Sequence, residues 1–344
     1  MAKKIKVGLI GAGRIGRVHA ENIRFNIPDA EVVAVADLYS DRIKDWASNL
    51  GIKYIFSDSQ KIMEDEAIDA VLICSSTDTH SALIIQAARA GKHIFCEKPI
   101  DFDLNRIQEA LQAVEKAGVK LQIGFQRRFD PSFKKAYDLI GQGKIGDIRV
   151  IKITSRDPAP PSLEYIKVSG GLFLDMTIHD FDMVRYLSRS EVTEVYAIGG
   201  VMVDKAIGEA GDIDTGIVTL KFANGALGVI DNSRQSLYGY DQRVEVLGSK
   251  GCILVGNPPL THAVLSTEEG FLNDKLQNFF IERYREAYIE EIKAFVDCLL
   301  NDKEPPVTGM DGLQPVLIGL AAKKSLFEGR PIPINSLSGG GLET

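Results

Sequence analysis

The sequence contains few of the residues that build metal centres and disulfide frameworks. Its 344 residues include four cysteines and five histidines. No two cysteines form a C-x-x-C pair, and no cysteine–histidine group has the spacing of zinc ligands. We therefore expect no metal. The cysteines stand in apolar surroundings, which is typical of buried, reduced thiols in the cytoplasm; they are Cys74, Cys96, Cys252 and Cys298.

Long apolar runs and an excess of positive charge are also absent. No apolar run approaches membrane-spanning length. Residues 1–4 lead directly into a predicted strand, without the apolar core and cleavage site of a secretion signal. The formal charge of −7 disfavours nucleic acid and anionic membranes as partners. We therefore expect a cytoplasmic protein with a small-molecule partner, long enough for two domains.

What the sequence does contain is a glycine-rich segment directly after an apolar strand. Residues 5–10 are that strand, and residues 11–16 read Gly-Ala-Gly-Arg-Ile-Gly, which fits G-x-G-x-x-G. Gly11 permits a tight turn, and Gly13 leaves room for a pyrophosphate to approach the backbone. A helix pattern follows at residues 15–26 and offers N-terminal N–H groups to the phosphates. This context predicts a dinucleotide site; a glycine-rich turn of another α/β protein is the alternative.

An acidic residue stands where the ribose of a dinucleotide would be recognised. Asp37 follows the predicted strand at residues 32–36, roughly twenty residues past the glycines. Its carboxylate would repel a 2′-phosphate, so we expect NAD rather than NADP. Asp37 alone also fits a helix N-cap or a solvated loop acid, but its position at the strand end favours the ribose.

Apolar strands and amphipathic helices alternate from residue 3 to about residue 121. This alternation predicts an α/β fold with a doubly wound parallel sheet of the Rossmann type over residues 1–124. The strands are expected at residues 4–10, 32–36, 70–74, 93–96 and 120–123, and the helices at residues 15–26, 41–50, 59–64, 80–90 and 104–117.

The pattern changes after Gly124. Helices at residues 131–140 and 174–187, together with strand-like runs joined by short turns, predict an α+β domain over residues 125–334. Asn224-Gly225 between two of these runs indicates a type I′ hairpin, so we expect a large, mostly antiparallel sheet. Its strands are expected at residues 148–155, 192–203, 215–222, 226–232, 242–247, 252–255 and 263–266.

Two further expectations concern what lies outside this sheet. Helices at residues 279–300 and 312–328 are expected to pack beside the first domain, and residues 335–344 to form a flexible tail. The helices of the domain can cover one face of a large antiparallel sheet, and the other face must be solvated or packed against another subunit. The strand runs are apolar on more than one face, so we expect a homo-oligomer, a tetramer or dimer, through this sheet.

Two clusters of polar residues have the composition that oxidation of an alcohol requires. The reaction needs a base for the hydroxyl proton and a donor for the oxygen, beside a nicotinamide. Lys98 follows a predicted strand at the carboxyl edge of the sheet, where such folds bind ligands; alone it also fits a solvated turn. Asp175 and His179 are spaced i, i+4 on one predicted helix, where a carboxylate can orient an imidazole base. A purely structural hydrogen bond between them fits equally.

Other polar residues carry weaker signals. Ser75, Thr77 and His80 follow a strand at the same sheet edge, and fit either cofactor contacts or a helix cap. Arg127 follows the next strand but one, and an ion pair at the domain junction is its alternative. Tyr240 lies in a polar aromatic turn that fits either a polyol site or a hairpin corner.

At these motifs the chain resembles the oxidoreductase family of glucose–fructose oxidoreductase and inositol dehydrogenase. The resemblance reaches about residue 334. The shared motifs are the glycine loop, Glu97-Lys98-Pro99, residues 124–130 (GFQRRFD) and residues 170–180 with Asp175-x-x-x-His179. Residues 155–161 and 238–243 resemble, more narrowly, bacterial inositol 2-dehydrogenases.

The resemblance implies oxidation of myo-inositol to 2-keto-myo-inositol (scyllo-inosose), with reduction of NAD and without a metal. It implies that Lys98 binds the reacting hydroxyl, that His179 is the general base and that Asp175 positions both. The alternatives are the same chemistry on another inositol isomer or sugar, and a regulatory protein that binds NAD without turnover. The expected cofactor contacts are Gly11, Ala12, Gly13, Arg14, Ile15, Asp37, Ser75, Thr77, His80, Glu97 and Lys98, and the expected substrate contacts are Lys98, Arg127, Asp157, Asp175, His179 and Tyr240.

Overall fold

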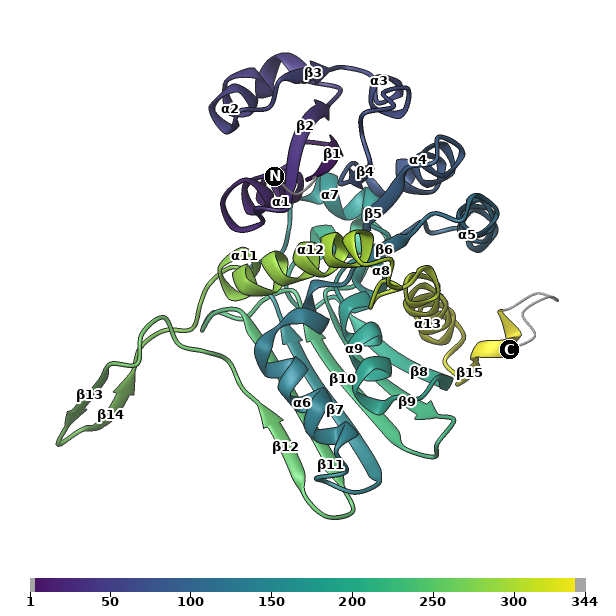
Figure 1. Cartoon of the computed structure of the whole chain (residues 1–344). Helices are drawn as coiled ribbons and strands as arrows, with labels where there is room; N and C mark the ends of the chain where they lie inside the picture. The colour runs from purple at the N-terminus through teal and green to yellow at the C-terminus, as the bar shows by residue number, and fades with distance from the viewer. Residues whose placement is uncertain (1–3, 338–344) are drawn as a thin grey trace. The chain divides into compact units, whose positions relative to one another are not determined.

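The computed structural model describes residues 4–337 and divides into two compact units (Figure 1). The first unit combines Met1–Phe129 with Glu286–Gln314, and the second combines Asp130–Arg285 with Pro315–Thr344. Most of the tail expected to be flexible, residues 338–344, lies outside the described residues. Within them, Ile334–Ser336 form the 3-10 turn η3. No helix in the described part of the chain is long and apolar enough to cross a bilayer.

The first unit is built on a parallel sheet. Within the described residues this sheet has six strands in the order β3-β2-β1-β4-β5-β6, and every neighbouring pair is parallel. This is the order of a doubly wound Rossmann sheet, so the predicted fold class is confirmed. The strands are β1 (Ile5–Ile10), β2 (Ala30–Ala36), β3 (Tyr54–Phe56), β4 (Ala70–Ile73), β5 (His93–Glu97) and β6 (Leu121–Gly124).

Helices cover this sheet, and its central strands are buried on both faces, as parallel sheets require. The helix α12 (Arg285–Leu300) comes from far along the chain and adds Ile292, Phe295 and Val296 to the core formed with β1 and α1. The rings of Phe95 and Phe295 have centroids 6.0 Å apart. The other helices are α1 (Arg14–Asn26), α2 (Lys44–Leu50), α3 (Gln60–Met63), α4 (Thr77–Arg89) and α5 (Leu104–Ala117), with the 3-10 turns η1 (Ser40–Ile43) and η2 (Gln126–Phe129).

The second unit contains a larger, mixed sheet. In the described chain it has seven strands in the order β12-β11-β7-β10-β9-β8-β15. β7 and β10 are parallel, and the other neighbours are antiparallel, as predicted. The strands are β7 (Ile148–Arg156), β8 (Val192–Gly200), β9 (Thr215–Phe222), β10 (Leu227–Ser233), β11 (Asp241–Gly248), β12 (Cys252–Val255) and β15 (Ile332–Pro333).

Strands of this second sheet alternate between buried and exposed residues. In β9, Val218 and Leu220 are buried, whereas their neighbour Ile217 is 44% exposed. Helices of the same unit, including α6 and α9, lie against one face of the sheet (Figure 1). The helices are α6 (Pro131–Gly141), α7 (Leu163–Val168), α8 (Leu172–Asp175), α9 (Ile178–Ser188), α10 (Lys205–Glu209), α11 (Phe280–Arg283) and α13 (Gly309–Glu328), which begins in the first unit.

The turn between β9 and β10 differs from the predicted type I′ turn. The hairpin itself is confirmed by the antiparallel pairing of these strands. Gly225 has a φ of +86°, but Asn224 is not among the residues with positive φ, as a type I′ turn would require. The N–H of Gly225 donates to the Phe222 carbonyl at 3.0 Å, so residues 223 and 224 are the centre of the turn. The Asn224 side chain accepts from the N–H of Ala226 at 3.1 Å and holds this conformation.

The cysteines differ in one respect from their expected burial. All four are free thiols; Cys96 and Cys298 are buried and Cys74 is partly buried. Burial raises the pKa of the Cys74 and Cys96 thiols well above the ordinary value, and the charge of Glu97 adds to the effect. Cys252 is exposed, because it lies on the edge strand β12 opposite the exposed Leu247.

A separate hairpin extends from the second unit. β13 (Val264–Thr267) and β14 (Gly270–Asn273) pair only with each other in a two-stranded sheet, and all of their residues are exposed. Figure 1 shows this hairpin reaching away from the seven-stranded sheet. The sequence predicts the first of these strands but assigns it to the large sheet, which is wrong, since β13 pairs with β14 alone within the described residues. The second strand is not predicted.

Candidate active site

The glycine loop between β1 and α1 is shaped by close packing on one side and open space on the other. Gly11 has a φ of +90°, and a Cβ there would lie 2.6 Å from the backbone nitrogen of Ser75. A Cβ on Gly16 would lie 2.0 Å from the Gly11 carbonyl oxygen. A Cβ on Gly13, by contrast, would meet nothing within 4 Å. Space therefore remains in front of Gly13, as the approach of a pyrophosphate requires.

The helix after this loop begins without a side-chain cap. α1 starts at Arg14, and its N-cap residue Gly13 makes no side-chain hydrogen bond. No acidic residue occupies the first turn, which also contains Ile15. The N–H groups of this turn and the positive end of the helix dipole fit the phosphates of a dinucleotide.

Asp37, directly after β2, is tied to the glycine loop. One of its carboxylate oxygens accepts from the N–H of Ala12 at 2.8 Å, and the other accepts from the N–H of Tyr39 at 2.8 Å. These bonds hold an acidic side chain beside the loop that faces the phosphates. Asp37 is only partly buried.

The segment after β4 packs against the segment after β5. The hydroxyl groups of Ser75 and Thr79 are 2.6 Å apart at the start of α4, where Thr77 is the first helical residue. His80 is buried, with Nδ1 2.8 Å from the Pro99 carbonyl oxygen and Nε2 3.1 Å from the Ser75 carbonyl oxygen. Ser75 and Pro99 therefore lie close together at the carboxyl edge of the sheet, next to Lys98.

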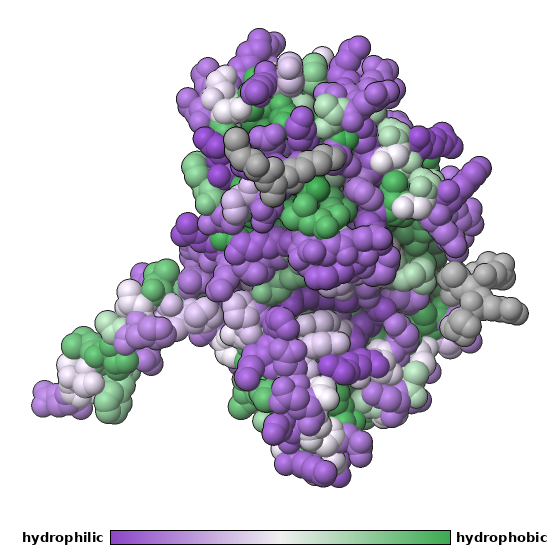
Figure 2. Space-filling model, viewed as in Figure 1, coloured by the Kyte–Doolittle hydropathy of each residue, from purple (hydrophilic) through white to green (hydrophobic). Residues whose placement is uncertain are grey.

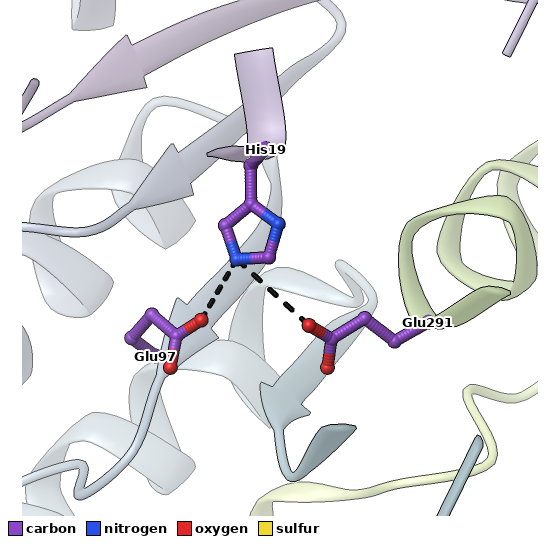
Figure 3. A group of neighbouring side chains, drawn as sticks. All are labelled: His19, Glu97 and Glu291. Carbon is purple, nitrogen blue, oxygen red and sulfur yellow. Dashed lines mark hydrogen bonds and ion pairs between the residues drawn. The ribbon is translucent and has the colours of Figure 1, made fainter. Parts of the chain in front are cut away.

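Glu97, the last residue of β5, belongs to a buried group with His19 and Glu291 (Figure 3). The Nε2 of His19 lies 2.8 Å from the Glu97 carboxylate and 3.9 Å from that of Glu291. The contact with Glu97 has the length of a hydrogen bond, whereas two ligands bonded at about 2.1 Å to the same tetrahedral zinc ion stand about 3.4 Å apart. Burial, followed by the charge of Glu97, raises the pKa of Glu291 well above its ordinary value.

In the second unit, Asp175 and His179 lie in two short helices rather than one. α8 ends at Asp175 and α9 begins at Ile178. The N–H of Thr177 donates to the Leu172 carbonyl at 3.0 Å, and the Thr177 hydroxyl lies 3.2 Å from the same oxygen. This five-residue step interrupts the regular helical pattern. The expected helix at residues 174–187 is therefore broken between the two candidate residues.

Asp175 is held by residues that the sequence analysis does not single out. One of its oxygens accepts from the Tyr165 hydroxyl at 2.8 Å, and the other accepts from Nη1 of Arg234 at 3.2 Å. Arg234 is only 1% exposed, and its Nη2 lies 3.8 Å from the Asp212 carboxylate. A buried charge requires partners, and Asp175 and Asp212 supply them for Arg234. The sequence carries no local signal for these contacts, because Arg234 and Tyr165 are 59 and 10 residues away from Asp175.

The start of α9, around His179, is fixed to the sheet through buried polar groups. The Thr177 hydroxyl donates to Oδ1 of Asn232 at 2.6 Å. The Nδ2 of Asn232 donates in turn to the Asp180 carboxylate at 2.8 Å. Asn232 lies on β10, so both neighbours of the Ile178-His179 pair are anchored to the same strand.

The remaining candidates are distributed over both units. Arg127, in η2 of the first unit, is buried. In the second unit, the N–H of Asp157 donates to the Ser233 carbonyl at 3.0 Å. Tyr240 is buried, with its ring centroid 6.1 Å from that of Tyr284. Lys98 therefore belongs to the first unit, and Asp175 and His179 to the second.

Comparison with known proteins matches both halves of the chain. Residues 5–125 match the family model described as an oxidoreductase family with an NAD-binding Rossmann fold. Residues 133–254 match the C-terminal domain of the GFO/IDH/MocA family. The chain belongs to this oxidoreductase family. The resemblance seen in the motifs is thereby confirmed, and the chain is an NAD-dependent oxidoreductase whose glycine loop and α1 fit the cofactor.

Several proteins are similar to this chain over nearly their whole length. The chain is 52% identical to an uncharacterised oxidoreductase of Bacillus subtilis, over 97% of this chain and 98% of that protein. It is 50% identical to the myo-inositol 2-dehydrogenase of Thermotoga maritima, over 97% of this chain and 100% of that protein. A solved structure of scyllo-inositol dehydrogenase from Lactobacillus casei, with bound NAD(H) and scyllo-inositol, matches with a TM-score of 0.91 and 33% identity, over 97% of this chain and 100% of that one.

Proposed function

We propose that the chain oxidises myo-inositol to 2-keto-myo-inositol and reduces NAD. The observation that carries the proposal is the place of Lys98. It follows β5 and lies beside the segment after β4, at the carboxyl edge of the sheet that also carries the glycine loop. An ammonium group at that edge suits the oxygen of a carbinol being oxidised. The named relative from Thermotoga maritima supports myo-inositol as the substrate.

The roles of the chain's residues follow from the chemistry. NAD, when bound, supplies the acceptor for the hydride. His179 removes the proton from the hydroxyl group, and Lys98 donates a hydrogen bond to the oxygen as it becomes a carbonyl. Asp175, held by Tyr165 and Arg234, positions substrate and base. Arg127, Asp157 and Tyr240 contribute to the binding of the polyol.

The cofactor preference of this proposal is NAD over NADP. Asp37 places a carboxylate beside the glycine loop through its bond to the N–H of Ala12. A carboxylate there accepts hydrogen bonds from a ribose and repels a 2′-phosphate. The further cofactor contacts that we propose are those of the glycine loop and of Ser75, Thr77, His80, Glu97 and Lys98.

A spectrophotometric assay tests the substrate and the cofactor together. Purified enzyme is mixed with NAD or NADP and one member of a panel that contains myo-inositol, scyllo-inositol and glucose. We expect reduction of NAD with myo-inositol at the highest kcat/KM. A clear preference for glucose would overturn the substrate, and NAD binding without turnover on any polyol would indicate a regulatory protein.

The alternative substrate with a specific observation behind it is scyllo-inositol, which is bound in the Lactobacillus casei relative. Oxidation of scyllo-inositol and oxidation of myo-inositol at its axial hydroxyl give the same ketone. Analysis of the product therefore does not separate the two substrates, and the comparison must use the initial rates with each isomer.

We infer that the chain forms a homo-oligomer, a dimer or tetramer, through the open face of the seven-stranded sheet. Ile198, Ile217, Leu227 and Leu254 are between 44% and 72% exposed on these strands. Apolar residues also gather on the extended hairpin, as Figure 2 shows, where Phe271 is 82% exposed. Such apolar surface is typical of an interface between subunits. Light scattering after gel filtration measures the assembly; a monomer at micromolar concentration would contradict it.

A further inference from the structure

Lys98 lies between two residues that buried histidines hold. The preceding Glu97 is bound through its carboxylate to Nε2 of His19 at 2.8 Å. The following Pro99 is bound through its carbonyl oxygen to Nδ1 of His80 at 2.8 Å. His19 is 0% and His80 is 1% exposed. The chain on each side of Lys98 is therefore fixed by one imidazole.

The two histidines belong to the helices that follow the expected cofactor loops. His19 lies in the second turn of α1, directly after the glycine loop. His80 is the fourth residue of α4, which follows Ser75. The position of Lys98 is thereby linked to both loops by short, buried contacts.

At each histidine, a particular ring nitrogen makes the contact with the residue next to Lys98. Both ring nitrogens of His80 face carbonyl oxygens, which only accept hydrogen bonds: Nδ1 faces that of Pro99 at 2.8 Å and Nε2 faces that of Ser75 at 3.1 Å. Nδ1 therefore makes the contact that reaches the segment of Lys98. At His19 the corresponding donor to the Glu97 carboxylate is Nε2. The carboxylate of Glu97 also lies close to Gly124, where an added Cβ would be 3.0 Å from its carboxyl carbon. Glu291, on the other side, is 3.9 Å from the same Nε2 (Figure 3).

We propose that His19 and His80 are positioning residues that hold Lys98 for the reaction, one through the Glu97 side chain and the other through the Pro99 carbonyl. This inference rests on the proposed function, which assigns Lys98 to the reacting oxygen. Neither histidine needs to touch the substrate. A displacement of about 1 Å at a reacting group costs up to about 100-fold in rate, so both bonds matter for turnover.

Substitution by Asn and Gln tests each bond separately. The amide nitrogen of Asn corresponds to Nδ1 of histidine, and that of Gln corresponds to Nε2. His19→Gln and His80→Asn therefore keep the donor that the structure uses, whereas His19→Asn and His80→Gln lose it. The two positions require opposite substitutions, which a role in packing alone does not predict.

The measurements are kcat and the primary deuterium isotope effect, with substrate deuterated at the carbon that gives up its hydrogen. We expect His19→Asn and His80→Gln to lower kcat by about 10- to 100-fold and to raise the isotope effect, because hydride transfer becomes slower than product release. His19→Gln should stay within about threefold of the wild type. His80→Asn, at a residue that we also propose to contact the cofactor, should keep a higher kcat than His80→Gln. A smaller folded fraction lowers the apparent kcat but leaves the isotope effect unchanged.

Lys98→Met is measured alongside these variants, so that the two hypotheses can fail separately. Wild-type turnover in Lys98→Met would overturn the proposed function of that residue. If Lys98→Met is inactive, equal damage by Asn and Gln at both positions, or wild-type kcat and isotope effect in all four histidine variants, would overturn the positioning role. Positions 19 and 80 are scored independently, so failure of one variant to fold leaves the other position to decide.

Discussion

In the first unit every residue of β4 is buried, whereas β9 of the second unit alternates between buried and exposed residues. The first sheet is covered on both faces, and its polar contacts gather at the strand ends: Asp37 binds the glycine loop, and His80 joins the segments after β4 and β5. The second sheet carries polar contacts among its buried residues, as between Asn232 and Asp180. The polar contacts of the parallel sheet therefore lie at the ends of its strands, whereas those of the mixed sheet lie among its buried residues.

The largest expected effect separates the roles of the two units. His179→Ala removes the proposed general base, which belongs to the second unit, and should lower kcat by roughly 10²- to 10⁴-fold. The NAD-binding fold belongs to the first unit, so the dissociation constant for NAD should stay within about threefold of the wild type. Steady-state kinetics and calorimetric titration with NAD measure the two quantities. Turnover close to that of the wild type would remove His179 from the mechanism.

The glycine loop allows a sharper contrast within the first unit. Gly16→Ala places a Cβ 2.0 Å from the Gly11 carbonyl oxygen, which should cost about 3 kcal/mol of stability through overpacking. Gly13→Ala meets no protein atom within 4 Å, so stability should change by less than about 0.5 kcal/mol. Its methyl group instead fills the space in front of the phosphates and should weaken NAD binding at least tenfold, by about 1.4 kcal/mol.

The fluorescence of Trp46, the only tryptophan of the chain and part of α2 in the first unit, follows the unfolding of both variants. Equal stability losses at positions 13 and 16 would show that Gly13 is needed for folding rather than for the cofactor.

Neighbouring residues of β9 test the one-sided burial of the second sheet. Val218→Ala removes fully buried methyl groups and should cost about 2 kcal/mol of unfolding free energy. Ile217→Ser, on the open face, should change the stability of a subunit by less than about 0.5 kcal/mol but weaken the assembly of subunits. Urea unfolding followed by circular dichroism measures the first effect, and light scattering the second. If Ile217→Ser leaves the assembly unchanged, the interface lies elsewhere.

The sequence predicts the first sheet better than the second, because the hydrophobic pattern of the first half is compatible with fewer arrangements of strands and helices. Continuous apolar strands alternating with helices admit one layered arrangement, and the glycine loop marks the cofactor edge. In the second half, the type I′ turn at Asn224-Gly225 is wrong because the Asn224 side chain binds the Ala226 N–H and selects another turn. The helix at residues 174–187 is broken because Thr177 binds both Leu172 and Asn232, and only the three-dimensional structure brings Asn232 there.

The site shows the same limit. The place of Lys98 directly after β5 could be predicted, because the end of a parallel strand is a recognisable position. Arg234 and Tyr165, which hold Asp175, could not, since they are 59 and 10 residues away in the chain. His19 is an intermediate case: a polar residue within the apolar face of α1 indicates a buried partner, but its partner Glu97 is 78 residues away.

The smallest expected effect concerns the buried group of His19, Glu97 and Glu291 at the end of β5. Burial raises the pKa of Glu291 above its ordinary value of 4.5, so the folded chain holds this proton more tightly than the unfolded chain. The contribution of Glu291 to the unfolding free energy is therefore greatest below pH 4.5 and is lost as the pH rises toward the folded-state pKa, by at most about 1.4 kcal/mol per pH unit.

Glu291→Gln removes this titration, so unfolding midpoints measured with Trp46 fluorescence from pH 4.5 to 8 should fall less steeply than those of the wild type. Glu290→Gln is the matched control, because Glu290 is about half exposed and pairs with Lys293 on the surface of the same helix. If the Glu291→Gln and wild-type curves run parallel over this range, Glu291 keeps its charge when buried.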